Sequence, residues 1–215
     1  RQLPDIQGEY FAGMIFSGAP IERLPFEDVD SWEELSAIID WSTEHVAGRL
    51  GICWGAQALM YRLHGVEKYE HPKKLFGIFD HTLETEQRPS GLLAGFTASF
   101  PMPVSRDTGN RPEAIEAASG LEIVARSEQS GVAMVRDTRS QDVFVLNHLE
   151  YDAETLAEEY ERDRSEGLET ALPENYFPVD DPGNSPANRW RPYAFLLIAN
   201  WLGSLYRKNP FDLEA

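Results

Sequence analysis

Cysteine is almost missing from this chain of 215 residues, which contains only Cys53. A single cysteine excludes an internal disulfide and suits a reducing compartment. Long apolar stretches are missing too: no run reaches the roughly 18 residues that a membrane-spanning helix requires. No secretory signal is visible, although the chain begins at Arg1 without a methionine, so its start carries no targeting information either way. The single cysteine favours a cytoplasmic protein.

Basic residues are scarce. The chain carries 19 Lys and Arg against 36 Asp and Glu, which gives a net charge of −17. This balance argues against a general nucleic-acid-binding protein, which needs a basic face. The apolar and charged fractions are typical of a globular protein, and no linker or repeat divides the chain. We therefore expect one domain over residues 1–215.

The single cysteine lies in Gly51-Ile52-Cys53-Trp54-Gly55, a G-x-C-x-G motif. Residues 47–52 predict a strand and residues 56–64 a helix, so the cysteine stands on a strand-to-helix turn. Small neighbours allow such a turn to close, and the positive end of the helix favours thiolate over thiol. The pattern indicates a nucleophile, and the alternative is a buried structural cysteine.

The other patterns predict an α/β protein. Apolar runs indicate further strands at residues 11–16, 75–79, 92–100, 121–126, 132–136 and 142–146. Helices are predicted from Ser31 to about His45, with a capping box to Glu34, then after a cap at Asp152, and from Pro192 in a largely buried helix. The second of these helices is expected to turn four acidic residues outward: Glu154, Glu158, Glu159 and Glu161. Residues 67–74 and 101–112 are interpreted as polar segments, and 167–187 as a long surface connection.

A cysteine nucleophile needs a base, and the base needs an acceptor that orients it. His148 and Glu150 follow the last strand of the central run. Residues two apart on an extended segment point the same way, so the carboxylate can reach the imidazole. The other four histidines lie near helix ends or in polar loops. The sequence therefore indicates a Cys53–His148–Glu150 arrangement.

Several segments together resemble the homoserine O-acyltransferases of methionine synthesis, which have the class I glutamine amidotransferase-like fold. The resemblance runs in order from about Phe11 to Leu213. It rests on Ser17-Gly18-Ala19-Pro20, Asp28-Val29-Asp30-Ser31-Trp32, Gly51-Ile52-Cys53-Trp54-Gly55-Ala56-Gln57, Lys74-Leu75-Phe76-Gly77, His148-Leu149-Glu150-Tyr151-Asp152, Asn175-Tyr176-Phe177-Pro178 and Asn200-Trp201-Leu202.

The resemblance implies a flavodoxin-like three-layer sandwich, with a mostly parallel sheet and helices on both faces. It also implies that Cys53 forms an acyl-thioester, that His148 is the base and that Glu150 is its partner. For the oxyanion of such a reaction, the expected donors are the backbone N–H groups of Trp54 and of Gly18 or Ala19.

The same resemblance implies four substrate contacts. Lys74 and Arg162 match positions that bind the amino-acid substrate, and Ser105 matches a position that sets its identity. Glu22 matches the position where the family uses glutamate for acetyl-CoA and glycine for succinyl-CoA. The alternatives are surface charges for Lys74 and Glu22, and for Arg162 an ion pair one helical turn earlier, with Glu158.

The chain departs from the family pattern at three points. Leu149 stands where the family has proline between the catalytic histidine and glutamate. Val104 and Asp107 replace the usual histidine and tyrosine around the specificity serine. The family also carries a segment upstream of the first matching residues, which this chain is expected to lack.

The resemblance predicts an acyltransferase that moves acetyl from acetyl-CoA to the homoserine hydroxyl by a ping-pong mechanism. Acetyl-CoA is then a co-substrate, and no metal or cofactor is expected. The partners are small molecules and, by analogy with the family, a second copy in a homodimer. The alternatives are transfer of succinyl, serine as the acceptor, a glutaminase domain of a glutamine amidotransferase, or a non-catalytic binding relative.

Overall fold

The computed structural model describes residues 2–84 and 91–208. The strands are β1 (Met14–Phe16), β2 (Arg49–Ile52), β3 (Lys68–Leu83), β4 (Ser99–Asn110), β5 (Leu121–Ser127), β6 (Gly131–Asp137) and β7 (Val143–Val145). The helices are α1 (Leu3–Ile6), α2 (Trp32–His45), α3 (Trp54–His64), α4 (Pro112–Ala117), α5 (Thr155–Ser165) and α6 (Arg191–Lys208). Residues 209–213, the end of the stretch that carries the resemblance, lie outside the described part.

The strands form a sheet with the order β1-β2-β7-β6-β5-β3-β4. Pairing is parallel for β1–β2 and β2–β7 and antiparallel for the other four neighbouring pairs. The α/β class is confirmed, but the expected mostly parallel pairing applies only to the β1–β2–β7 half. Short connections join β5 to β6 and β6 to β7, and a short connection can join only antiparallel neighbours.

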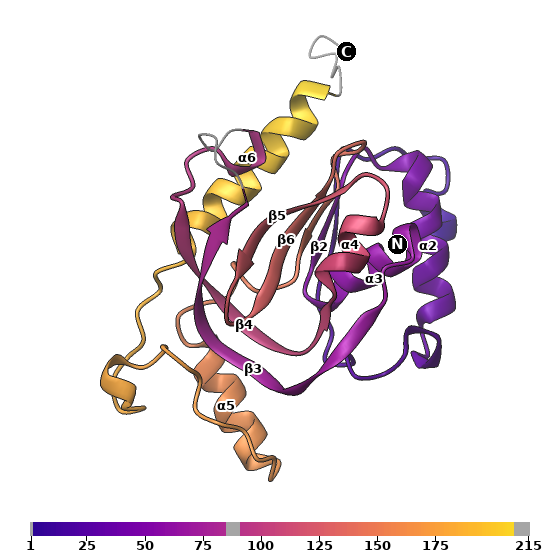
Figure 1. The fold of residues 1–215 in the computed structure, drawn as a ribbon. Coiled ribbons are helices and arrows are strands. Elements are labelled where there is room, and N and C mark those ends of the chain that lie inside the picture. The colour runs from indigo at the N-terminus through magenta and orange to yellow at the C-terminus, as the bar shows by residue number, and fades with distance from the viewer. Residues whose placement is uncertain (1, 85–90, 209–215) are drawn as a thin grey trace.

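Helices cover both faces of the sheet and make three layers (Figure 1). On one face α2, α3 and α4 pack over a core that includes Ile39, Leu59, Ile115 and Phe144. On the other face α6 packs over a second core through Leu197, Trp201 and Leu205, together with Trp190, which precedes the helix. The carboxyl ends of β2 and β7 therefore open between the layers, where ligands of α/β sheets usually bind.

The largest difference from the predicted elements is a long hairpin made by β3 and β4. Residues 67–74 and 101–112 were predicted to be polar segments, and 92–100 a strand. The structure instead pairs Tyr69 with Gly109 and Thr82 with Ser99 in one antiparallel ladder, with a bulge between Glu70 and Leu75. The hairpin forms one edge of the sheet, and Figure 1 shows that it bends toward α3.

Residues 105–108 of the hairpin looked like a loop in the sequence because they are polar on both faces. Ser105 and Asp107 line the cavity described below, while Arg106 and Thr108 are buried. The Arg106 guanidinium donates to the backbone carbonyls of Ser130 and Val132. Apolar alternation is confined to the first part of β4, where Phe100, Met102 and Val104 are buried.

Three helix details also differ from the predictions. Ser31 precedes α2, but its side chain makes no capping hydrogen bond. The residue at the cap position of α5 is Glu154, whereas Asp152 forms an ion pair with Arg191. Helix α6 is only partly covered, because Phe195 and Leu202 are more than half exposed. Helix α3 is followed by Gly65, whose left-handed φ of 69° suits a glycine C-cap.

Candidate active site

Cys53 lies between the end of β2 and the first residue of α3. Its backbone has φ 52° and ψ −122°, a conformation that residues with a side chain rarely adopt. The backbone N–H of Cys53 donates to the carbonyl of Val145 in β7 at 2.7 Å, which anchors the turn to the sheet. The structure thus gives the predicted strained elbow. Helix α3 begins two residues earlier than predicted, directly after Cys53.

The glycines on both sides of the elbow are required because a side chain at either position would collide with neighbouring backbone. A β-carbon at Gly51 would lie 2.5 Å from the α-carbon of Ala56. At Gly55 it would lie 2.3 Å from the carbonyl oxygen of Phe16 and 2.6 Å from that of Ser17. These neighbours are backbone atoms, which cannot rotate away. The G-x-C-x-G spacing therefore allows β1, the elbow and α3 to pack directly on one another.

We expect Gly55→Ala to lower the free energy of unfolding by about 2 kcal/mol or more, because overpacking against backbone is not relieved by a rotamer change. Urea denaturation measures the effect. Gly8→Ala is the matched control, since a β-carbon there meets nothing within 4 Å. Equal stability of the two variants would show that the elbow tolerates a side chain at Gly55.

His148 and Glu150 follow β7 and reach the same point as Cys53 from the neighbouring strand. The His148 Nδ1 and the Glu150 Oε1 are 2.6 Å apart, so the predicted contact is present. The ring of His148 is buried and stacks on Tyr151 at a centroid distance of 4.0 Å. Leu149 between them is buried in the core, so the departure from proline leaves the histidine and the glutamate on the same side.

The charge state of His148 follows from its neighbours. Burial opposes a charge on the ring and acts to lower its pKa, but the Cys53 sulfur and the Glu150 carboxylate outweigh burial and raise the pKa of His148 to about 10. The ring therefore carries a proton at neutral pH in the free protein. A histidine that is hydrogen-bonded to a cysteine sulfur is the arrangement that activates a cysteine nucleophile.

The residues expected to form the oxyanion site lie next to the sulfur. A β-carbon on Gly18 would be 3.1 Å from the β-carbon of Cys53 and 3.7 Å from its sulfur. Gly18 and Ala19 belong to the segment after β1, and Trp54 opens α3, where backbone N–H groups have no partner within the helix. The arrangement suits a developing negative charge beside Cys53, and the donor role stays a prediction.

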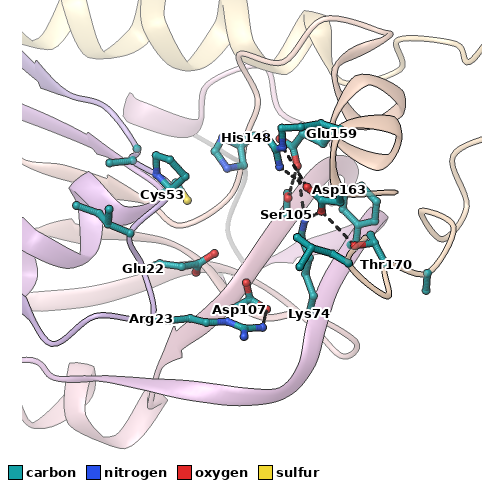
Figure 2. Close-up of a pocket in the computed structure, with 18 of the residues that line it drawn as sticks. Glu22, Arg23, Cys53, Lys74, Ser105, Asp107, His148, Glu159, Asp163 and Thr170 are labelled. Carbon is teal, nitrogen blue, oxygen red and sulfur yellow. Dashed lines mark hydrogen bonds and ion pairs between the residues drawn. The ribbon is translucent and has the colours of Figure 1, made fainter. Parts of the chain in front are cut away.

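A cavity of about 1280 Å³ opens at Cys53. Figure 2 shows its side chains, with Cys53 and His148 at one end and Lys74 and Asp163 at the other. The walls come from the segment at residues 17–24, from the β3–β4 hairpin, from α5 and from residues 166–174. All of Gly18, Ala19, Glu22, Cys53, Lys74, Ser105, His148, Glu150 and Arg162 line it. The cavity thus gathers nine of the ten predicted site residues, while Trp54 is buried beside the nucleophile.

The three predicted substrate contacts meet through two carboxylates on α5. Ser105 donates to the Oε2 of Glu159 at 2.5 Å. Lys74 donates to the Oδ2 of Asp163 at 3.0 Å and lies 3.9 Å from Glu159. The Arg162 Nη2 donates to the Oδ1 of Asp163 at 2.6 Å, so the alternative of an ion pair with Glu158 is wrong. Lys74 and Arg162 therefore lie on either side of one acid.

Glu22 points into the cavity from the segment that follows β1 (Figure 2). Its Oε2 accepts hydrogen bonds from the backbone N–H of Thr108 at 3.0 Å and from the Thr108 hydroxyl at 2.9 Å. The neighbouring Arg23 pairs with Asp107 at 2.7 Å. Glu22 is consequently held in place by β4, and the alternative of a surface glutamate is wrong.

The sequence reasoning missed Glu159, Asp163 and Tyr151. Glu159 was expected to face outward, but it lines the cavity and accepts hydrogen bonds from Ser105 and, at 2.6 Å, from Tyr151. Burial and then Glu159 raise the pKa of Tyr151 far above its usual value, so the hydroxyl stays a donor. A signal was available: Glu159 and Asp163 are one helical turn apart and share a face with Arg162.

Two negative findings concern the residues that the structure describes. Among them, no helix is both long and apolar enough to cross a membrane. Within the same ranges, no three side chains of a metal-binding type gather at one point.

The fold and the elbow together define a class. Glutamine amidotransferases from Methylobacillus flagellatus and Thermotoga maritima share the fold, with TM-scores of 0.64 and 0.62. Their alignments cover 92% and 90% of this chain and 78% and 77% of those chains, at 17% and 14% identity. The protein therefore has the predicted class I glutamine amidotransferase-like fold.

Sequence comparison identifies the family within this class. A family model described as homoserine O-succinyltransferase matches residues 1–211. A homoserine O-acetyltransferase from Desulfitobacterium hafniense is 48% identical over 215 residues, which is all of this chain and 69% of that protein. One from Geobacillus kaustophilus is 46% identical over 213 residues, 99% of this chain and 70% of that protein. The chain belongs to the homoserine O-succinyltransferase family, which confirms the predicted acyltransferase class.

Proposed function

We propose that the protein is a homoserine O-acetyltransferase of methionine biosynthesis, which transfers acetyl from acetyl-CoA to the homoserine hydroxyl. The observation that carries the proposal is one cavity with a cysteine–histidine–glutamate set at one end and paired cations at the other. The relatives named homoserine O-acetyltransferase support it. The enzyme is cytoplasmic, takes acetyl-CoA as a co-substrate and uses no other cofactor. It acts on small molecules, and a homodimer stays a prediction.

Acylation of Cys53 is the first half of the proposed reaction. The thiolate attacks the carbonyl carbon of acetyl-CoA, and the N–H groups of Trp54 and of Gly18 or Ala19 stabilise the oxyanion. The carbon–sulfur bond to CoA then breaks, and the protonated His148 gives its proton to the departing CoA sulfur. The products are an acetyl-thioester on Cys53, free CoA and a neutral imidazole.

Acylation also changes the base. The thioester carries no charge, so the sulfur that helped to raise the pKa of His148 no longer does so. The neutral ring can then take the proton of the acceptor hydroxyl, whose oxygen attacks the thioester carbonyl. The bond to Cys53 breaks, the ester is released, and His148 keeps the proton that it took from the hydroxyl, so the pair of thiolate and protonated imidazole forms again. Glu150 keeps the ring oriented in both steps.

The far end of the cavity suits an amino-acid acceptor. A zwitterion needs cations for its carboxylate and an anion for its ammonium group. Lys74 and Arg162 provide the cations, and Glu159 beside Ser105 provides the anion. Together with Asp163 these charges sum to zero, which matches the net charge of the proposed acceptor.

The acyl donor is expected to be acetyl-CoA because Glu22 is fixed at the acyl end of the cavity. A succinyl group would bring its own carboxylate close to Glu22, and two like charges a few ångströms apart cost roughly a few kcal/mol at an effective dielectric near twenty. We expect the wild type to prefer acetyl-CoA by about a hundredfold or more on this estimate. Steady-state kcat/KM values with the two donors measure the preference.

Two variants separate the charge of Glu22 from its size. Glu22→Gln removes the charge and keeps the volume, whereas Glu22→Gly removes both. Glycine should shift the preference toward succinyl-CoA more than glutamine does, since it also opens space for the longer chain. Equal wild-type rates with both donors would mean that Glu22 does not set donor choice.

The function itself is tested with four substrate pairs: acetyl-CoA or succinyl-CoA against homoserine or serine. Ester formation should be fastest with acetyl-CoA and homoserine. A glutaminase is the second candidate, because the proteins that share the fold are glutamine amidotransferases. Ammonia release from glutamine, with no ester from any pair, would replace the proposed function by that one.

A further inference from the structure

Asp163 is a buried carboxylate near the end of α5 that joins three parts of the cavity wall. The sequence analysis assigned it no role. Its neighbours in space come from β3, from α5 itself and from the segment at residues 166–174, all of which line the cavity. Figure 2 shows Asp163 next to Lys74 and Thr170, on the opposite side of the cavity from Cys53.

Both oxygens of Asp163 are used. The Oδ1 accepts from the Nε and the Nη2 of Arg162, at 3.0 and 2.6 Å. The Oδ2 accepts from the Lys74 Nζ at 3.0 Å and from the Thr170 hydroxyl at 3.2 Å. The backbone carbonyl of Asp163 also accepts from the N–H of Leu168. Asp163 therefore holds two cations with its side chain, and with its side chain and backbone it holds residues 170 and 168 of a segment that lines the cavity.

The orientation of the two cations depends on this acid. Arg162 is about half exposed, and among the described residues the hydrogen bonds and the ion pair of its guanidinium go to Asp163 alone. Lys74 lies over the ring of Phe76 at 4.4 Å, and Asp163 fixes the end of its flexible stem. Long charged side chains lose much rotamer freedom when a ligand orders them, so cations already held in place bind an anion at a lower entropic cost.

The side chain of Asp163 is a carboxylate at neutral pH. Burial acts to raise its pKa, but the hydrogen bonds from Arg162 and Lys74 outweigh burial and lower the pKa of the carboxyl. The acid stays ionised at neutral pH and leaves one surplus positive charge on the two cations. That surplus is available to an incoming carboxylate.

We propose that Asp163 is a positioning residue for the acceptor substrate, holding Lys74 and Arg162 in one geometry and tying residues 168–170 to them. The proposal rests on the proposed function, because it assigns the carboxylate of the acceptor to these two cations. Asp163 is far from the sulfur, so it acts on the second half of the reaction and not on acylation of Cys53.

The test is Asp163→Asn with the two halves of the reaction measured separately. The amide keeps the shape but replaces one acceptor oxygen by a donor, so one cation loses its partner. We expect the KM for homoserine to rise about tenfold or more, while CoA release in a single turnover with acetyl-CoA alone changes less than about threefold. A purely structural defect would slow CoA release as well, and that result would overturn the positioning role.

Glu161→Gln is the matched control, since Glu161 is exposed on the same helix and pairs only with Arg164 among the ion pairs of the described residues. It should leave both measurements unchanged. Thr170→Val removes the tie to residue 170 and should raise the KM less than Asp163→Asn does. If Asp163→Asn does not fold, Asp163→Glu, which displaces the charge by one methylene, must show the same split between KM and acylation.

An unchanged or lower homoserine KM in the folded Asp163→Asn variant would overturn the proposal, because it would mean that Asp163 repels the acceptor or does not affect it. If only Asp163→Glu folds, an unchanged or lower homoserine KM in that variant would overturn the proposal in the same way. Failure of the proposed function is a different result: the wild type would then form no ester with homoserine.

Discussion

Cys53→Ala is expected to reduce acetyl transfer by at least about 10⁴-fold, since the sulfur forms the covalent intermediate and nothing else in the elbow replaces it. The measurement is steady-state release of CoA in the presence of homoserine. Intact-protein mass spectrometry with acetyl-CoA alone should show one acetyl adduct on the wild type and none on the variant. The adduct separates a covalent mechanism from direct transfer.

The fold should survive this substitution. Alanine also carries a β-carbon, so it meets the same backbone strain at φ 52° as cysteine does. The free energy of unfolding of the variant is therefore expected to stay within about 1 kcal/mol of the wild-type value. Substantial turnover in a folded Cys53→Ala variant, or an acetyl adduct on another residue, would exclude the thioester mechanism.

His148→Ala is expected to lower the rate by several orders of magnitude, because both halves of the proposed reaction pass a proton through this ring. The raised pKa of His148, about 10, keeps the ring protonated at neutral pH, so it can give a proton to the departing CoA sulfur. Acylation by the wild type should therefore be lost as the pH rises from about 8 to about 11 and the ring loses that proton. Single-turnover acylation over this range measures the effect.

Glu150→Ala tests the third member and should be less severe. The imidazole remains but loses the partner at 2.6 Å that orients it. His45→Ala is the matched control, since His45 stacks on Trp41 at the end of α2, away from the cavity. Full activity of Glu150→Ala would show that another group orients His148, and full activity of His148→Ala would remove it from the mechanism.

The catalytic end of the cavity was predictable because its signals are local. The elbow depends on two glycines within two residues of Cys53, and each of them is required by a backbone neighbour. His148 and Glu150 are two residues apart on one extended segment, so their contact needs no knowledge of the rest of the fold. The strands and helices around them follow from apolar runs, which burial makes easy to recognise.

The end of the cavity that holds Lys74, Ser105 and Arg162 could not be predicted from local sequence in this way. Residues 67–74 and 101–112 looked like loops, since strands that face a polar cavity lack the apolar alternation that identifies a strand. Only the paired hairpin places Ser105 beside α5 and Thr108 against Glu22. The sequence resemblance named Lys74, Ser105 and Arg162, but not the acids that hold them.

The sequence alone thus predicted the elbow, the contact of His148 with Glu150, the α/β class and the family. The tertiary structure decided which acidic residues face inward. Glu159 and Asp163 are two of 36 acidic residues, and their spacing of one helical turn places them on one face of α5 without showing that this face lines a cavity. Their burial comes from contacts with residues far away along the chain, 89 positions in the case of Lys74 and Asp163. Such a pairing depends on the path of the whole hairpin, which is a property of the folded chain and not of any segment.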